Sequence, residues 1–147
     1  NAKVFTINLG APKTVNFNPL PPGVNNNDPV NVFQNINFPG WIWFQDALNQ
    51  GAIYFNDPMA ITRTFTFVNG PRILQSMLVR HFDPAGASIT ITGTNDKGEA
   101  APPLSIQGGQ FQSLNTLWVK CSQTVTVTLD TATDNIGIVE LTYLGPP

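Results

Sequence analysis

The chain has 147 residues, a length that suits one domain and buries roughly two thirds of its unfolded surface on folding. Charged residues make up only 11% of the sequence, against roughly a quarter in an average soluble domain, and the net charge is −2. Because the seven basic residues are scattered and no apolar run approaches ~20 residues, we expect neither a nucleic-acid face nor insertion into a membrane.

The composition also indicates the fold class, because helix-forming residues are scarce and β-branched residues are abundant, as in all-β proteins. Threonine, asparagine, glycine, proline and glutamine replace the missing charges, and such a neutral polar surface is typical of extracellular β-proteins. We therefore expect a secreted protein with one domain at 1–147, either a mature protein or a module of a larger one. The single cysteine, Cys121, excludes an internal disulfide bond.

Short runs that alternate between apolar and polar residues predict about nine strands, separated by turn-forming residues. The stretch at 18–31 is rich in asparagine and proline and predicts a long loop. No helix-sized interval separates the strands, so we expect an antiparallel two-sheet β-sandwich of jelly-roll type, with a closed β-barrel as the alternative. In chain order, the predicted strands lie at 3–9, 40–45, 51–55, 60–68, 73–82, 87–94, 117–122, 124–129 and 136–144, and a short segment at 103–106 pairs back on its neighbour.

The stretch FPGWIWFQ places four aromatic residues within seven positions. If its second half is a strand, Trp41 and Trp43 share one face, and Ile42 and Phe44 share the other. Isoleucine and phenylalanine are the commoner core residues, whereas tryptophan is rarely buried completely. We therefore expect at least one of the two tryptophans to be partly exposed and to face a ligand; the alternative is that both pack beneath the asparagine-rich loop. Trp118 lies in a dense apolar stretch and is expected in the core.

The stretch at 122–143, SQTVTVTLDTATDNIGIVELTY, resembles the closing hairpin of galactose-binding-domain-like β-sandwiches, a group that includes many secreted carbohydrate-binding modules. In that group a threonine- and valine-rich strand leads through a loop ending in asparagine, which Asn135 matches, into an apolar strand. The apolar positions of that strand are matched by Ile136, Ile138 and Leu141. An aspartate common near the start of the strand is missing, and Gly137 and Val139 stand there instead. The segment at 76–99 is similar to the central hairpin of secreted sandwich domains.

This resemblance implies non-catalytic binding of carbohydrate on loops at one edge of the sandwich. The apolar face of a sugar ring stacks on an aromatic ring, and its hydroxyls need planar amide or carboxylate partners. The low charge and the many amides favour a neutral polysaccharide or oligosaccharide. The loop residue Asn135 is carried over from the family pattern, although an Asx-turn is the alternative role. The candidate ligand-binding residues are Trp41, Trp43, Tyr54, Arg80 and Asn135.

Two arginines, Arg63 and Arg80, are unusual because they lie in apolar strands. They either form buried ion pairs or line a groove, where the planar guanidinium hydrogen-bonds hydroxyl groups. The sequence leaves both roles open.

A structural calcium ion is also implied by the resemblance, because many of these modules hold one. Calcium takes six to eight oxygen ligands, commonly including carboxylates. The candidate ligands are Asp28, Asp130 and Asp134, whose spacing matches no known calcium motif. One histidine and one cysteine are too few for a zinc or copper site, and we expect no other cofactor.

Two other classes of function compete with a binding module. One is a structural or interaction protein, such as an adhesin, coat or tail component, which exposes the same aromatics to a protein partner. The other is a small polysaccharide-active enzyme. Glycoside hydrolysis needs two carboxylates about 5 to 9 Å apart across a cleft. No pair among the nine acidic residues lies in a catalytic motif, so we predict no catalytic residue.

Overall fold

The computed structural model describes residues 10–54, 61–81, 87–93, 104–106, 111–129 and 136–145. Within these residues the chain forms eleven β-strands and no helix, as the composition predicts. The strands are β1 (Lys13–Asn16), β2 (Pro29–Phe33), β3 (Ile36–Gln45), β4 (Gly51–Tyr54), β5 (Thr62–Phe67), β6 (Ile73–His81), β7 (Ala87–Gly93), β8 (Leu104–Ile106), β9 (Phe111–Asn115), β10 (Thr124–Leu129) and β11 (Ile136–Leu144).

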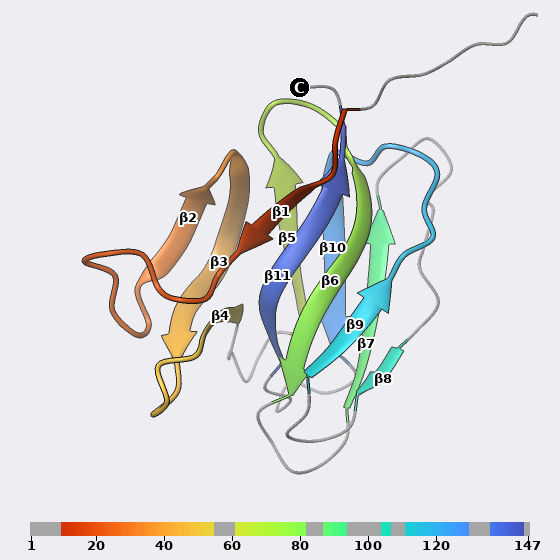
Figure 1. The fold of residues 1–147 in the computed structure, drawn as a ribbon. Helices are drawn as coiled ribbons and strands as arrows, with labels where there is room; N and C mark the ends of the chain where they lie inside the picture. The colour runs from red at the N-terminus through yellow and green to blue at the C-terminus, as the bar shows by residue number, and fades with distance from the viewer. Residues whose placement is uncertain are drawn as a thin grey trace, which may run out of the picture.

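All pairings between these strands are antiparallel, and the sheet curls into two layers. In Figure 1, β1, β11, β6 and β9 lie in front of β5, β10 and β7. The strand order is β8-β7-β10-β5-β3-β4-β11-β6-β9, with β1 added on β11 and β2 added on β3. The fold is therefore the predicted antiparallel β-sandwich of jelly-roll type. The alternative of a closed barrel is wrong, since this order ends at β8 and β9, and these two strands do not pair within the described part of the chain.

The strand predictions differ from the structure in several places. Strands β1 and β2 were not predicted, and β2 begins inside the stretch at 18–31 that was expected to be a loop. The predicted strand at 3–9 lies outside the described residues, and the prediction at 117–122 is wrong. The strand of this region is β9, which ends before residue 117. Within 117–122, the one β-type pairing is an isolated bridge between Ser122 and Arg72. By contrast, β10 and β11 have the predicted bounds, and β8 pairs with β7 as expected.

The core lies between the two layers, and strict alternation along the strands builds it. In β10, Val125, Val127 and Leu129 are buried, whereas the threonines between them face outward. These threonines pair with threonines of β5 through hydroxyl contacts, 3.0 Å for Thr66–Thr124 and 3.3 Å for Thr62–Thr128. Such cross-strand pairs fix the register of a sheet whose outer face is solvated.

Strand β3 contains a bulge that reverses which residues face the core. The three residues of β2 from Pro29 to Asn31 lie opposite the five residues of β3 from Phe38 to Ile42, so β3 has two extra residues here. Gly40 sits in this bulge with φ +80°, a conformation that glycine adopts without steric cost. The buried residues of β3 therefore change from even to odd positions: Ile36, Phe38, Trp41 and Trp43.

The prediction that a tryptophan of this strand is partly exposed is wrong, because the bulge turns both indoles inward. Trp41 is 1% exposed and Trp43 is 3% exposed. The Trp41 indole N–H donates to the Thr64 carbonyl oxygen at 3.0 Å, which satisfies its polar atom inside the core. The Trp43 ring centroid lies 5.0 Å from that of Phe33 and 5.9 Å from that of Phe17. The expected burial of Trp118 is confirmed.

Candidate functional site

A row of residues crosses five strands on the outer face of the front layer. The register places Phe111 of β9 opposite Arg80 of β6, and Arg80 opposite Gly137 of β11. Gly137 in turn lies opposite Tyr54 of β4, which lies opposite Ile42 of β3. Because directly opposite residues of antiparallel strands point to the same face, these five residues form one continuous row. We call it the outer row.

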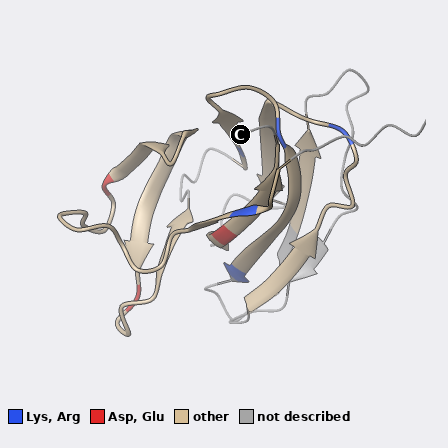
Figure 2. Cartoon of the chain, turned by 45° about the horizontal axis from the view of Figure 1, so that its top comes forward, with Lys and Arg blue, Asp and Glu red and all other residues tan. Residues whose placement is uncertain are grey.

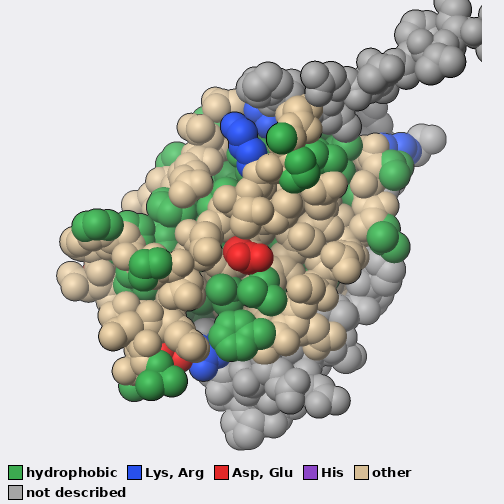
Figure 3. Space-filling view, in the orientation of Figure 1, with side chains coloured by type: hydrophobic (Ala, Val, Ile, Leu, Met, Phe, Trp, Pro, Cys, Tyr) green, Lys and Arg blue, Asp and Glu red, His purple; other side chains and the backbone are tan. Residues whose placement is uncertain are grey.

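The outer row faces away from the core, as the neighbouring residues show. The residues next to it along β6, β11, β4 and β3 all belong to the buried core, and they are Val79, Ile138, Ile53 and Trp43. Since successive residues of a strand point to opposite faces, the outer row points away from the core. Phe111 is exposed, Ile42, Tyr54 and Arg80 are partly exposed, and Gly137 is buried between its neighbours. Figure 3 shows this side of the molecule, where hydrophobic side chains gather close to an acidic and a basic group.

Arg80 is held in place near one end of the outer row. Its Nη1 lies 2.6 Å from Asp46 Oδ2 and donates to Gln50 Oε1 at 3.3 Å. The guanidinium carbon lies 5.1 Å from the centroid of the Phe111 ring, within the range of a cation–π contact. Of the two roles that the sequence allows for Arg80, the structure shows the ion pair, and it places that pair on the outer face.

Asp46 is fixed as firmly as its partner. Its Oδ1 accepts the backbone N–H groups of Leu48 and Gln50, each at 2.9 Å. The hydrogen bond from Arg80 and the backbone N–H of Gln50 lower the pKa of Asp46 below its ordinary value. Asp46 is therefore ionised at neutral pH, and the pair that it forms with Arg80 carries no net charge.

Two aromatic rings belong to the outer row: Phe111 lies at one end, and Tyr54 lies next to Ile42 at the other. Phe111 is 47% exposed, and the Arg80 guanidinium lies over its ring. Tyr54 is half-buried, and its ring packs edge-on against Phe44 with centroids 5.2 Å apart. The Tyr54 hydroxyl lies 3.5 Å from Asn27 Oδ1, and burial raises the pKa of Tyr54. Gly137 places no side chain between Tyr54 and Arg80.

A hollow of about 360 Å³ lies at the other end of β6 and β9, away from the outer row. Ser76 of β6 is opposite Asn115 of β9, and it shares a face with Arg80 because the two are four residues apart on one strand. The walls of the hollow are hydroxyl and amide groups together with the edge of Leu117 and Trp118. Such a lining offers hydrogen-bond donors and acceptors without net charge.

The remaining predicted site residues have different outcomes. Asn135, Asp130 and Asp134 lie outside the described residues, so their roles stay predictions. Asp28 is described, and its Oδ2 accepts the backbone N–H of Asn25 at 2.9 Å, which closes a turn. No group of three or more histidine, cysteine or acidic residues that can hold a metal occurs in the described part of the chain, and the calcium ion stays an expectation.

The sequence alone singles out Tyr54 and Arg80, and the structure brings them onto one face. It moves Trp41 and Trp43 to the core and adds Phe111 and Asp46. Phe111 was missed because it begins β9, whereas the sequence predicted the strand of this region at 117–122. Figure 2 shows that the described strands carry few charged residues, which is why an arginine in an apolar strand was a usable signal.

No protein-family model and no curated protein sequence matches the chain. Solved structures do match, and they show that the chain shares the β-sandwich fold of carbohydrate-binding modules, the fold that the resemblance implies. None of the described residues forms a helix long and apolar enough to cross a membrane.

Two of these structures are family 29 carbohydrate-binding modules. One has a TM-score of 0.56 and 11% identity over 93% of this chain and 91% of that chain. The other, from Piromyces equi, has a TM-score of 0.54 and 12% identity over 92% of this chain and 90% of that chain. A family two carbohydrate esterase from Cellvibrio japonicus has a TM-score of 0.50 and 14% identity over 92% of this chain, but only 34% of the esterase. At these identities the likeness is one of fold.

Proposed function

We propose that the chain is a non-catalytic carbohydrate-binding domain and that the outer row is its binding face. The observation that carries this proposal is the row itself, which combines Phe111, Arg80 and Tyr54 on one solvent-facing surface. Aromatic faces accept the C–H side of a sugar ring, and a guanidinium held by Asp46 presents N–H donors in a fixed direction. The carbohydrate-binding modules with the same fold support the same function.

The shape and charge of the row indicate the kind of saccharide. Three strand spacings separate Phe111 from Tyr54, which corresponds to about 14 Å between their Cα atoms. An extended saccharide of several rings matches that length better than a single sugar does. The ionic groups of the row cancel in the Arg80–Asp46 pair, so an uncharged, hydroxyl-rich polysaccharide or oligosaccharide is favoured. Such ligands and the low charge of the chain also favour an extracellular setting.

The state of Asp46 fits a positioning role and does not fit the general acid of a glycoside hydrolase. A glycoside hydrolase needs one carboxylic acid that is protonated at working pH, and enzymes obtain it by raising a pKa. In Asp46 the opposite occurs, because Arg80 lowers its pKa. A carboxylate that is held ionised by an arginine and by two backbone N–H groups orients a donor and does not release protons.

A binding panel tests the proposal. Wild type, Tyr54→Ala, Phe111→Ala and the control Val32→Ala are mixed with soluble and insoluble neutral polysaccharides, and bound protein is quantified. Val32 is an apolar residue of β2 that is 60% exposed and lies off the outer row, so its truncation controls for lost surface hydrophobicity. We expect wild type and Val32→Ala to bind alike and the two aromatic variants to bind weakly. Wild type that binds no glycan, or aromatic variants that bind like wild type, would reject the proposal.

A further inference from the structure

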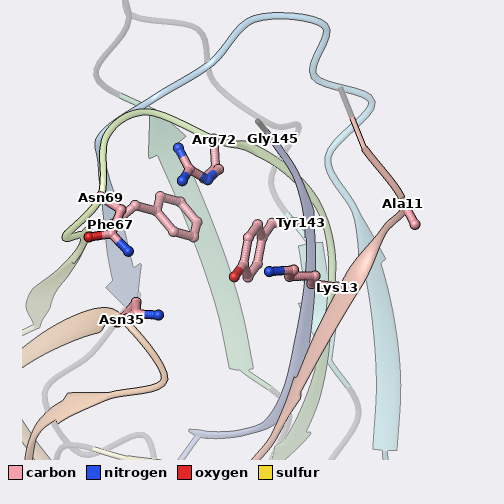
Figure 4. A pocket seen from close by; sticks show the side chains of 8 residues that line it. All are labelled: Ala11, Lys13, Asn35, Phe67, Asn69, Arg72, Tyr143 and Gly145. Carbon is pink, nitrogen blue, oxygen red and sulfur yellow. The ribbon is translucent and has the colours of Figure 1, made fainter. Parts of the chain in front are cut away.

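A small pocket lies at one end of the sandwich, between the two layers and away from the outer row. Figure 4 shows its lining, which comes from the ends of β1, β5 and β11 and from two turns. Its volume is about 60 Å³. A water molecule needs roughly 15 Å³ of such space, so the pocket has room for a chemical group of a few atoms and not for a whole sugar ring.

Two aromatic rings from opposite layers form the back of this pocket. The ring of Phe67 in β5 lies 5.1 Å from the ring of Tyr143 in β11. An irregularity in the pairing of β11 with β6, between Thr142 and Tyr143, brings Tyr143 opposite the buried Leu74. Tyr143 consequently faces the interior at the point where the layers separate.

Two cations reach the same space, one from each side. Lys13 lies opposite Tyr143, and it shares its face of β1 with the buried Val15. Arg72 is only 9% exposed, and its Nη1 donates to the Pro71 and Gly70 carbonyl oxygens at 2.9 and 3.2 Å. Its side chain also packs against Gly145 so closely that a Cβ there would overlap it. The guanidinium is thus fixed at the pocket wall.

The charge of the lining is unbalanced. None of the eight described residues that line the pocket is acidic, whereas Lys13 and Arg72 are cationic. Figure 4 shows the amides of Asn35 and Asn69 on the side of the pocket across from Lys13. Two cations with neutral hydrogen-bonding groups around a small space favour an anionic group, because a guanidinium that is largely removed from water needs a counter-charge.

We propose that this pocket binds the carboxylate of an acidic sugar, a uronic acid residue. The carboxylate lies between the Lys13 amine and the Arg72 guanidinium, and the sugar ring stays at the mouth, where the two asparagine amides hydrogen-bond its hydroxyls. The saccharide part of this proposal rests on the proposed function, whereas the preference for a carboxylate rests on the pocket alone. The pocket is a second site, distinct from the uncharged ligand of the outer row.

NMR titration of the ¹⁵N-labelled protein at matched ionic strength tests this inference with four probes: glucuronate, glucose, acetate and inorganic phosphate. Glucuronate and glucose differ only by the carboxylate. We expect glucuronate to shift the amide signals of Lys13, Asn35 and Tyr143, and glucose to leave them in place. Lys13→Gln, which removes one charge from an exposed position, should weaken glucuronate at least fivefold. The matched control Lys120→Gln removes an exposed charge elsewhere and should bind as wild type does.

The outcomes separate this proposal from the one for the outer row. Each of three results overturns the uronic acid site. Glucose shifts the same signals as strongly as glucuronate, acetate or phosphate binds as tightly as glucuronate, or Lys13→Gln binds glucuronate with unchanged affinity. Tyr54→Ala and Phe111→Ala should lose the neutral polysaccharide and keep glucuronate. If glucuronate binds the pocket while no neutral glycan binds wild type, the outer-row proposal fails and the pocket proposal stands.

Discussion

Arg80 and Phe111 lie directly opposite each other on neighbouring strands, with the guanidinium carbon 5.1 Å from the ring centroid. The same guanidinium is paired with Asp46 at 2.6 Å. One side chain thus connects an open aromatic ring to a fixed carboxylate on the solvent-facing side of the sheet. We regard this arrangement as the centre of the proposed binding face.

The aromatic character of Phe111, and not its bulk alone, should determine sugar affinity. Phe111→Tyr keeps a ring and should bind a neutral polysaccharide within about twofold of wild type, whereas Phe111→Leu should bind about 3- to 10-fold more weakly, since an aromatic contact is worth about 0.5–1.5 kcal/mol beyond its area. Isothermal titration calorimetry measures both. Equal affinities for the leucine and tyrosine variants would show that the ring does not stack on the ligand.

The ion pair of Asp46 should give the folded protein an acid-dependent stability. Because Arg80 lowers the pKa of Asp46 in the folded state, the stabilisation is present above the unfolded value of about 3.9 and is lost as the pH falls through the lower folded value. Arg80→Gln should therefore unfold at lower urea than wild type at neutral pH, and the difference should shrink at pH values below about 3.9. Urea midpoints measured across this range check the prediction. A difference that is the same at both pH extremes would contradict it.

Gly40→Ala should destabilise the protein through two effects at the bulge of β3. The φ of +80° disfavours a side chain, and a Cβ at this position would lie 2.8 Å from Arg63 Nε. We expect a loss of about 2–3 kcal/mol in the free energy of unfolding. Gly23 is the matched control, because it has φ +81° and a Cβ there would meet nothing within 4 Å, so Gly23→Ala should lose only about 1 kcal/mol. Equal losses in chemical denaturation would mean that Arg63 moves aside without cost.

Trp41→Phe should reduce stability and leave sugar binding intact. The substitution removes a buried N–H donor to the Thr64 carbonyl and part of a buried ring, which together are worth about 1–3 kcal/mol. The folded variant should bind a neutral polysaccharide with the affinity of wild type, because Trp41 does not reach the outer face. A loss of affinity without a loss of stability would restore the tryptophan as a ligand-facing residue.

The parts of the fold that the sequence predicts well are those in which a simple alternation determines burial. Strand β10 has the predicted bounds because its threonines alternate with aliphatic residues. Strand β11 also has the predicted bounds, although its first four residues are all buried. The faces of β3 were predicted in reverse, since the bulge at Gly40 depends on pairing with β2, which lies in a stretch expected to be a loop. Period-two reasoning assumes an unbroken strand, and an irregularity such as this bulge can exchange the faces of the residues beyond it.

The candidate site shows the same division. Residue type alone drew attention to Tyr54 and Arg80, because an aromatic phenol and an arginine are uncommon on a neutral sheet. Their proximity depends on β11, which pairs with β4 on one side and with β6 on the other, and Gly137 stands between them. That strand is separated from both by a long stretch of chain, and no local pattern encodes which long-range neighbours a strand acquires.

An NMR titration of the wild-type protein with a neutral oligosaccharide of several rings, read at the residues of the outer row, tests most directly whether this row is the binding face. The signals of Arg80, Phe111, Gly137 and Tyr54 should shift together with one dissociation constant, while those of core residues such as Val79 stay in place. A saccharide that binds and shifts signals elsewhere, with the outer row unchanged, would show that this row is not the binding face.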